Sequence, residues 1–386
     1  MTDGLLARAR VVEFGNLIAA PYAGMLLADL GAEVVKVEPP SGDLGRHFGP
    51  YQGGESWFFL SVNRGKRSVV LDLKQPAAHR WAVELCRRAD VVLHNQRRGV
   101  MERLGLGWED LQAVNPRLVY AVVAAFAADG PEADRVGIDV IFQGESGMIS
   151  ITGHPADPPQ KTATTIGDYL AGTNTALGIC AALVERAATG RGRRVDVSLR
   201  DGLVAVQSGW NALYFATGEQ PRRTGTASPF LAPNQVLPTA DGHLTLGIVS
   251  DSHFVLLCRT IGIPDLAEEL PTNEVRMARR EELAARLEAV FRRDTTEAWV
   301  GRLQDAGLPV GRVLTLPEVL ADGRRVVEYD HPVAGRVRAT GSPLRVDGAQ
   351  LVAASPPPTL GGDTVEVLKG LGATDQEIEA LRGAMA

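Results

Sequence analysis

The chain has 386 residues, a formal net charge of -6, 45% hydrophobic residues and 5% aromatic residues. Single hydrophobic cores rarely grow beyond roughly 250–300 residues, so we expect more than one domain. An acidic chain with few aromatic rings and no long run of Lys or Arg is a poor match for a nucleic-acid-binding protein.

The cysteines and the start of the chain indicate the compartment. Cys86, Cys180 and Cys258 are far apart and lack the CxxC spacing of zinc and redox sites. An odd count without that spacing argues against a disulfide framework and a metal site, and it fits a reducing environment. The first residues show no cationic segment followed by an apolar run, and no apolar stretch reaches the ~20 residues that span a bilayer. We therefore expect a cytoplasmic protein with no membrane or nucleic-acid partner.

Strands and helices alternate through the first half of the chain. Short, nearly continuous apolar runs predict strands buried on both faces at residues 11–14, 34–37, 68–71, 91–93 and 118–123. Pro21 opens a predicted helix that Gly31 ends, and residues 76–89 predict a second helix. This βαβ pattern indicates an open, mainly parallel, Rossmann-like α/β sheet.

The second half of the chain differs in composition and in its pattern of predicted elements. A long, largely buried helix is predicted from about Asp168 to Ala188, and Gly190 supplies its stop. After a strand at 195–199, residues rich in Gly, Pro, Thr and Ser lead to a hairpin at Asp241-Gly242 and several short helices. We expect a large α/β domain with connectors (residues 1–217 and 325–386) and a smaller α+β domain (residues 218–324).

Several well-known catalytic motifs are absent from the sequence. The turn after the first strand lacks GxGxxG, and Gly65-Lys66 lacks the upstream glycine of a P-loop. Met148 stands where a nucleophile elbow needs its last glycine, and the histidines show no metal-binding spacing. Dinucleotide binding, NTPase, serine hydrolase and metal hydrolase functions therefore lose their main support.

An ordered set of short fragments resembles the family III CoA-transferases, which include formyl-CoA transferase and the carnitine and bile-acid (CaiB/BaiF) CoA-transferases. The fragments are LADLGAEVVKVE at 27–38, NRGKRS at 63–68, LDLK at 71–74, RLG at 103–105, NPRL at 115–118, TGRG at 189–192 and VLKGLG at 367–372. The resemblance covers nearly the whole chain. It implies an enzyme that moves CoA from an acyl-CoA to a carboxylic acid, with no permanently bound cofactor or metal and with two chains interlocked in a homodimer.

The resemblance places the family's nucleophile at Asp168, in Ile166-Gly167-Asp168-Tyr169 ahead of the TGRG stretch. It implies a mixed anhydride with the donor acid, followed by an aspartyl-CoA thioester that the acceptor acid opens. An ionised carboxylate needs no adjacent base for such an attack, unlike a serine. The competing interpretation is structural, because Asp is a favoured helix N-cap.

The resemblance also implies a group of CoA-binding residues. Two cations at the outer edge of a βαβ sheet, Lys74 and Arg103, suit the phosphates of CoA, and Arg46 is expected near the same edge. Asp139 matches an acidic position that orients the active-site region. The full implied set is Ile18, Ala19, Leu71, Lys74, Asn95, Gln96, Arg97, Arg103 and Asp139.

Departures from the family pattern leave alternatives open. Pro39, Ile18 and the lack of a Gly-rich insertion disfavour formyl-CoA and oxalate as substrates, whereas succinyl-CoA is a reasonable donor by analogy. Ile138 stands where an α-methylacyl-CoA racemase needs a proton-transferring His, which argues against that activity. Gln96 and Ile138 together keep open a non-catalytic CoA-binding paralogue.

Overall fold

The computed structural model describes residues 4–383, which fold as two compact units. The first unit contains the chain up to Met148, Thr162–Ala212 and the residues from Gly323 onward. The second contains Ile149–Lys161 and Leu213–Asp322. The second unit thus includes the segment 149–161, which the sequence prediction left in the large domain.

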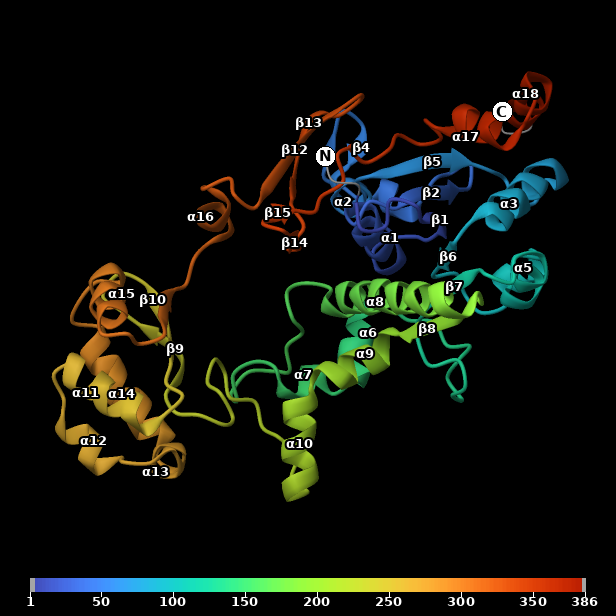
Figure 1. Ribbon diagram of the computed structural model, residues 1–386. Helices are drawn as coiled ribbons and strands as arrows, with labels where there is room; N and C mark the ends of the chain where they lie inside the picture. The colour runs from blue at the N-terminus through green and yellow to red at the C-terminus, as the bar shows by residue number, and fades with distance from the viewer. Residues whose placement is uncertain (1–3, 384–386) are drawn as a thin grey trace. The chain divides into compact units, whose positions relative to one another are not determined.

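A six-stranded parallel sheet forms the centre of the first unit (Figure 1). Its strands, in spatial order, are β5 (Lys66–Val70), β2 (Glu33–Glu38), β1 (Arg10–Phe14), β6 (Val91–His94), β7 (Val119–Ala124) and β8 (Arg194–Ser198). Val12 of β1 lies opposite Val35 of β2 and Val92 of β6. The apolar runs predicted these strands because a parallel sheet is buried on both faces, and the predicted fold class is confirmed.

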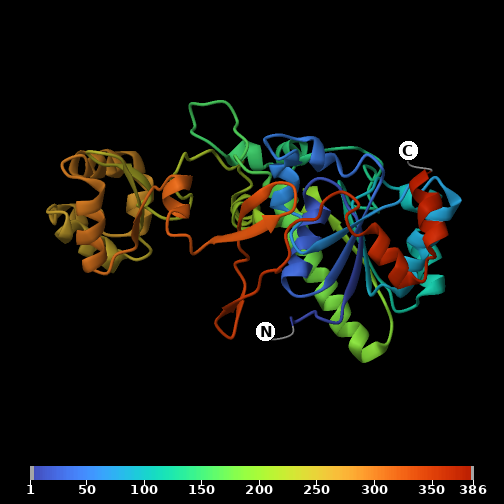
Figure 2. The ribbon, with the colours of Figure 1, turned by 90° about the horizontal axis from the view of Figure 1, so that it is seen from above.

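Helices cover both faces of this sheet, as Figure 2 shows for α8 (green) and α17 (red). One face carries α1 (Ala19–Asp29), α6 (Asp139–Glu145), α8 (Ile166–Thr189) and α9 (Leu199–Val206). The other carries α3 (Pro76–Arg88), α4 (Val100–Arg103), α5 (Trp108–Val114), α17 (Thr364–Leu371) and α18 (Asp375–Gly383). Two separate hydrophobic clusters result, one on each face.

The C-terminal segment protects the edge strand β5. The Asp363 carboxylate accepts a hydrogen bond from the Ser68 N–H (2.8 Å), and the Thr364 hydroxyl accepts one from the Val70 N–H (3.0 Å). These bonds occupy donors that an exposed edge strand would offer to another chain. Smaller elements complete this unit: η1 (Leu44–His47), β3 (Tyr51–Gln52), β4 (Glu55–Ser56), α2 (Trp57–Ser61), β12 (Val326–His331), β13 (Gly335–Thr340), β14 (Arg345–Val346) and β15 (Ala349–Gln350).

The second unit is built on the hairpin predicted at Asp241-Gly242. Its antiparallel sheet contains β11 (Val310–Arg312), β10 (His243–Gly247) and β9 (Asn234–Pro238), in that order. The helices are α11 (Asp251–Thr260), α12 (Asp265–Glu269), α13 (Asn273–Ala278), α14 (Arg280–Phe291), α15 (Thr296–Asp305) and α16 (Leu316–Leu320). Leu237, Leu244 and Phe291 belong to one core. Two further helices, α7 (Met148–Ile151) and α10 (Ser208–Thr217), lie at the borders between the units along the chain.

Over residues 4–383, no helix combines the length and apolar character needed to cross a bilayer. The same residues contain no group of three or more His, Cys, Asp or Glu side chains placed to hold a metal ion.

Helices α1 and α8 approach each other closely at Gly172. A Cβ atom added to Gly172 would lie 2.7 Å from the carbonyl oxygen of Ala19 and 3.0 Å from the Tyr22 ring. The α1 backbone cannot withdraw without moving the whole helix. Glycine therefore sets the spacing between the two helices.

We predict that Gly172→Ala destabilises the protein by about 1–3 kcal/mol, because the added methyl group overpacks this contact. Gly202→Ala, in α9, is the matched control, since its Cβ would meet no atom closer than 3.7 Å. Urea unfolding followed by circular dichroism measures both. A Gly172→Ala midpoint equal to that of the Gly202→Ala control would contradict the tight contact.

Candidate active site

The carboxyl end of the sheet has a switch point between β1 and β6, because the chain leaves β1 toward β2 on one side and returns to β6 on the other. Ligands of open α/β sheets bind outside the strands at such points. Here Asn95 accepts a hydrogen bond from the Asn16 N–H (2.9 Å) and donates one to the Asn16 carbonyl (2.8 Å). Gln96 donates to the Phe14 carbonyl (2.9 Å). Both side chains therefore tie the loops after β1 and β6 together.

Buried charges support the loop between β1 and α1. The Glu13 side chain is 0% exposed, and its carboxylate lies 2.8 Å from Lys36 Nζ and 2.7 Å from Lys66 Nζ. Lys36 also donates to the Gly15 carbonyl (2.7 Å), and Lys66 donates to the Pro21 carbonyl (2.7 Å). Two buried ammonium groups thus hold both ends of this loop.

The middle of the same loop is held in an unusual conformation. Leu17 has a φ of 64°, in the left-handed region that residues other than glycine rarely adopt. Its N–H donates to Asp43 Oδ1 (2.9 Å), and Asp43 Oδ2 lies 2.8 Å from Lys36 Nζ. The following residues, Ile18 and Ala19, are buried. The loop is therefore fixed along its length, and its two ligand-binding candidates contribute mainly packing.

Asp168 lies in the first turn of α8, on the helix that packs against α1. It precedes Gly172 by one helical turn, and residues four apart share a helix face. At Gly172 the helix packs against the first turn of α1, at Ala19. The next residue, Tyr169, packs edge-on against Tyr22 with ring centroids 4.9 Å apart. Asp168 therefore lies one helical turn before the contact between α8 and α1.

The structure does not use Asp168 as a helix cap. The helix α8 begins at Ile166, so Asp168 is its third residue, and the N-cap is Thr165. Among the residues that the structure describes, none donates a hydrogen bond to the Asp168 carboxylate. Burial, and next the negative charge of Asp139, raise the pKa of Asp168 to about 7. This carboxyl group is therefore poorly solvated and has no hydrogen-bonding partner in the described part of the chain.

Asp139 supplies the missing cap. It is the first residue of α6, and its Oδ1 accepts a hydrogen bond from the N–H of Gly167 in the first turn of α8 (2.8 Å). Its Oδ2 accepts a bond from Gln143 Nε2 (2.5 Å). Both oxygens are occupied within the chain, so Asp139 positions α8. The family resemblance implied that Asp139 orients the active-site region, and that role stays a prediction.

The cationic candidates lie beyond the switch point. Lys74, in the loop before α3, Arg97, after β6, and Arg103, at the end of α4, are exposed. Within residues 4–383 their side chains contact no acidic partner. His79 of α3 hydrogen-bonds the Leu104 carbonyl, which places the beginning of α3 beside the end of α4. Three uncompensated cations are thus available to an anion.

Two other candidates have structural roles. Leu71 is 1% exposed and belongs to the core on the α3 face. Arg46 makes two hydrogen bonds to the Glu38 carboxylate (2.7 and 2.8 Å) and lies over the Phe59 ring, 3.6 Å from its centroid. Its guanidinium is therefore not free to bind a ligand.

The sequence analysis missed the buried charges and Gln143. Glu13 and Lys36 each interrupt an apolar strand, and a charge inside such a run is a visible signal of a buried ion pair. Lys66 and Asp43 have no comparable signal, because they lie at the end of a strand and in a loop. Their partners come from neighbouring strands and loops, so only the fold reveals them.

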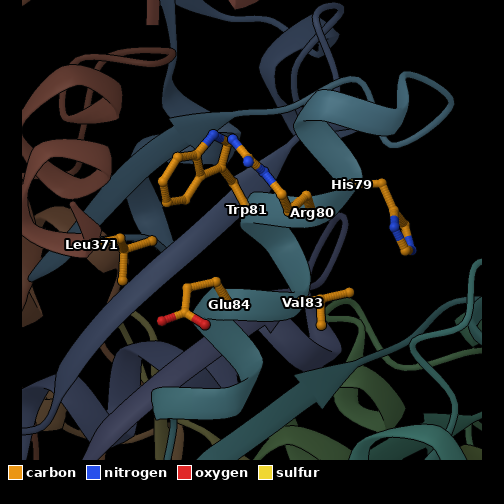
Figure 3. Close-up of a pocket in the computed structure, with 6 residues that line it drawn as sticks. All are labelled: His79, Arg80, Trp81, Val83, Glu84 and Leu371. Carbon is orange, nitrogen blue, oxygen red and sulfur yellow. The ribbon is translucent and has the colours of Figure 1, made fainter. Parts of the chain in front are cut away.

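A surface pocket of about 540 Å³ lies away from Asp168, on the opposite face of the sheet (Figure 3). It is lined by residues of α3 and by Leu371. The polar groups there are already paired: Arg80 lies over the Trp81 ring and forms an ion pair with Glu377 (2.6 Å). Nothing in this pocket resembles a reactive centre.

Chemically, the arrangement around Asp168 suits nucleophilic attack by a carboxylate. Neither a base nor a metal is needed to activate an ionised Asp, and weak solvation of the carboxylate makes its attack easier. The long helix α8 directs the positive end of its dipole at the same group, which favours the ionised form.

Comparisons with known proteins match the chain to one enzyme family. The family model for CoA-transferase family III matches residues 6–364. The chain is 36% identical over 350 residues to acetyl-CoA:oxalate CoA-transferase of Acetobacter aceti, covering 90% of this chain and 89% of that protein. It is 33% identical over 373 residues to succinyl-CoA:glutarate CoA-transferase of Mus musculus, covering 94% and 86% of the two chains.

The fold is also found in a solved structure. The crystal structure of a CaiB/BaiF family protein from Brucella suis superposes with a TM-score of 0.85 at 33% identity. The match covers 96% of this chain and 100% of that one.

Proposed function

Because the chain belongs to CoA-transferase family III, we propose that it transfers CoA between an acyl-CoA and a carboxylic acid with Asp168 as a covalent nucleophile. One observation supports this role above the others. The Asp168 side chain is partly buried, and within residues 4–383 its carboxylate makes no hydrogen bond, although the turn that carries it is anchored by Asp139. A structural aspartate would be expected to cap or to pair.

The proposed reaction requires only the acyl-CoA donor, the acceptor acid and the Asp168 carboxylate. The Asp168 carboxylate attacks the thioester carbonyl of the donor, giving a mixed anhydride and CoA thiolate. The thiolate attacks the aspartyl carbonyl, which releases the donor acid and leaves an aspartyl-CoA thioester. The acceptor carboxylate then attacks the aspartyl thioester, which gives the second mixed anhydride and expels the CoA thiolate. Finally the thiolate attacks the acceptor carbonyl of this anhydride, which forms the new acyl-CoA and releases the Asp168 carboxylate.

The proposed CoA site extends from Asp168 across the switch point. Lys74, Arg97 and Arg103 would bind its phosphates, since cationic side chains form charge-assisted hydrogen bonds with phosphate oxygens. Asn95 and Gln96 would shape the path between the two ends through the loops that they hold together.

The names of the relatives suggest the class of acid. Oxalate and glutarate, the acceptors named for the two relatives, are both dicarboxylic acids. We propose a dicarboxylic acid as one substrate of this chain, with acetyl-CoA and succinyl-CoA as the first donors to test. The sequence departures that disfavour oxalate make glutarate the first acceptor.

Asp168→Asn should lower the transfer rate by at least about 10³-fold, because an amide cannot form the anhydride. Asp201→Asn is the matched control: Asp201 is also the third residue of its helix, and it is exposed. Transfer from succinyl-CoA to glutarate, with circular dichroism to confirm folding, measures both. Substantial activity in folded Asp168→Asn would refute the proposed nucleophile.

The transfer rate should depend on pH through Asp168. Since only the carboxylate attacks and its pKa is raised to about 7, kcat/KM should fall about tenfold per pH unit below pH 7 and level off above it. A pH profile with a stable acyl-CoA donor measures this. A profile that stays flat down to pH 5 would show that Asp168 keeps an ordinary carboxyl pKa.

Removing a phosphate-binding cation should weaken CoA binding most at low salt, where charge pairing is least screened. We expect this of Lys74→Ala and Arg103→Ala. Arg191→Ala is the control, because Arg191 is exposed near the amino end of β8, at the opposite edge of the sheet. Calorimetric titration with CoA at two salt concentrations tests the difference. Equal affinities for all three variants would exclude these cations from the site.

We also propose that the protein is an interlocked homodimer. Leu177 is 68% exposed and Val184 is 73% exposed, and they lie seven residues apart on one side of α8. Apolar side chains grouped on a helix face favour a protein partner. Sedimentation at micromolar concentration should give a dimer that dilution does not dissociate, and a monomer would contradict the proposal.

A further inference from the structure

Gln143 is a fully buried amide in the middle of α6, 0% exposed and one turn after Asp139. Its Nε2 donates to Asp139 Oδ2 (2.5 Å) and, over a longer distance, to the Thr164 carbonyl (3.4 Å). Its Oε1 accepts hydrogen bonds from the N–H (2.9 Å) and the hydroxyl (3.1 Å) of Thr162. A single side chain thus connects α6 to the segment that leads into α8.

Asp139 and Gln143 hold this segment at both ends. Gln143 binds it at Thr162, and Asp139 binds it at Gly167 through Oδ1 (2.8 Å). The contact at Gly167 is tight, because a Cβ atom on this residue would lie 2.8 Å from Asp139 Oδ1 and 3.1 Å from Leu203 Cδ1. The backbone that leads to Asp168 is therefore held by two side chains of α6.

The Asp168 side chain depends on this anchoring. Among the described residues no group bonds to its carboxylate, so its direction follows from the backbone that carries it. Gln143 also fixes the orientation of the Asp139 carboxylate, since it occupies the oxygen that does not bind Gly167. Without Gln143, Asp139 Oδ2 and the Thr162 N–H would each lose a buried partner, and the segment would move to regain hydrogen bonds.

We infer that Gln143 is a positioning residue for the transfer reaction, acting through Asp139 and residues 162–167 to aim the Asp168 carboxylate. The inference rests on the proposed role of Asp168. A misplacement of about 1 Å can cost about 10²-fold in rate, so the loss of the Gln143 bonds should slow the chemical step. The cations proposed to bind CoA lie elsewhere, so CoA affinity should not change.

Gln143→Met tests this, because methionine keeps the length of the side chain but can neither donate nor accept as the amide does. We expect kcat to fall about 10–100-fold, while KM for the acyl-CoA donor and the calorimetric affinity for CoA stay close to those of the unchanged protein. Gln207→Met is the matched control. Gln207 is also buried and donates to the Ser146 (3.1 Å) and Leu203 (2.7 Å) carbonyls, and within residues 4–383 it forms no hydrogen bond with Asp139.

A Gln143→Met variant with unchanged kcat would overturn the inference, as would equal kcat losses in the two variants. If Gln143→Met does not fold, Gln143→Ala decides by the same criteria. Asp168→Asn is measured alongside. If Asp168→Asn is inactive and Gln143→Met is fully active, only the inference about Gln143 fails. If Asp168→Asn is active, the proposed nucleophile fails and the inference fails with it.

Discussion

The site depends on one buried carboxylate, Glu13, which lies between two buried lysines. The lysines fix the loop that precedes α1. Helix α1 also packs tightly against Glu13, because a Cβ atom on Gly24 would lie 2.0 Å from Glu13 Oε2. Because α1 in turn sets the position of α8 at Gly172, the location of Asp168 follows from this ionic core. Breaking a buried ion pair typically costs about 3–5 kcal/mol, so the arrangement is strongly specified.

A second anchor holds α8 from the opposite direction, through α6. The Asp139 carboxylate accepts a hydrogen bond from the first turn of α8, as an N-cap side chain would. Within the described residues, the Asp168 carboxylate therefore has no hydrogen bond to make for the stability of the helix. Opposing electrostatic effects then act on Asp168. Burial and the nearby Asp139 disfavour its charge, whereas the dipole of α8 favours it. With a pKa of about 7, the carboxyl group is ionised above neutral pH and still weakly solvated, which is the state that the proposed attack requires.

The sequence predicted the large sheet well, because apolar runs such as Val11–Phe14 record burial on both faces. It predicted the long helix from about Asp168, and the helix begins at Ile166; the carboxylate that binds its first turn comes from Asp139, in a different helix. Family resemblance selected Asp168, and local pattern alone would have favoured a cap. The side chains that support the site could not be predicted from the sequence. Lys66 and Gln143 form hydrogen bonds with segments that only the fold brings near them.

Mass spectrometry of the peptide that contains Asp168 tests the covalent role most directly. The protein is mixed with succinyl-CoA and quenched with hydroxylamine, which opens an aspartyl thioester or anhydride to an aspartyl hydroxamate. We predict the hydroxamate at Asp168, only when the acyl-CoA is present. An unmodified Asp168 in a preparation that transfers CoA, or a hydroxamate formed at another carboxylate, would contradict the proposed nucleophile.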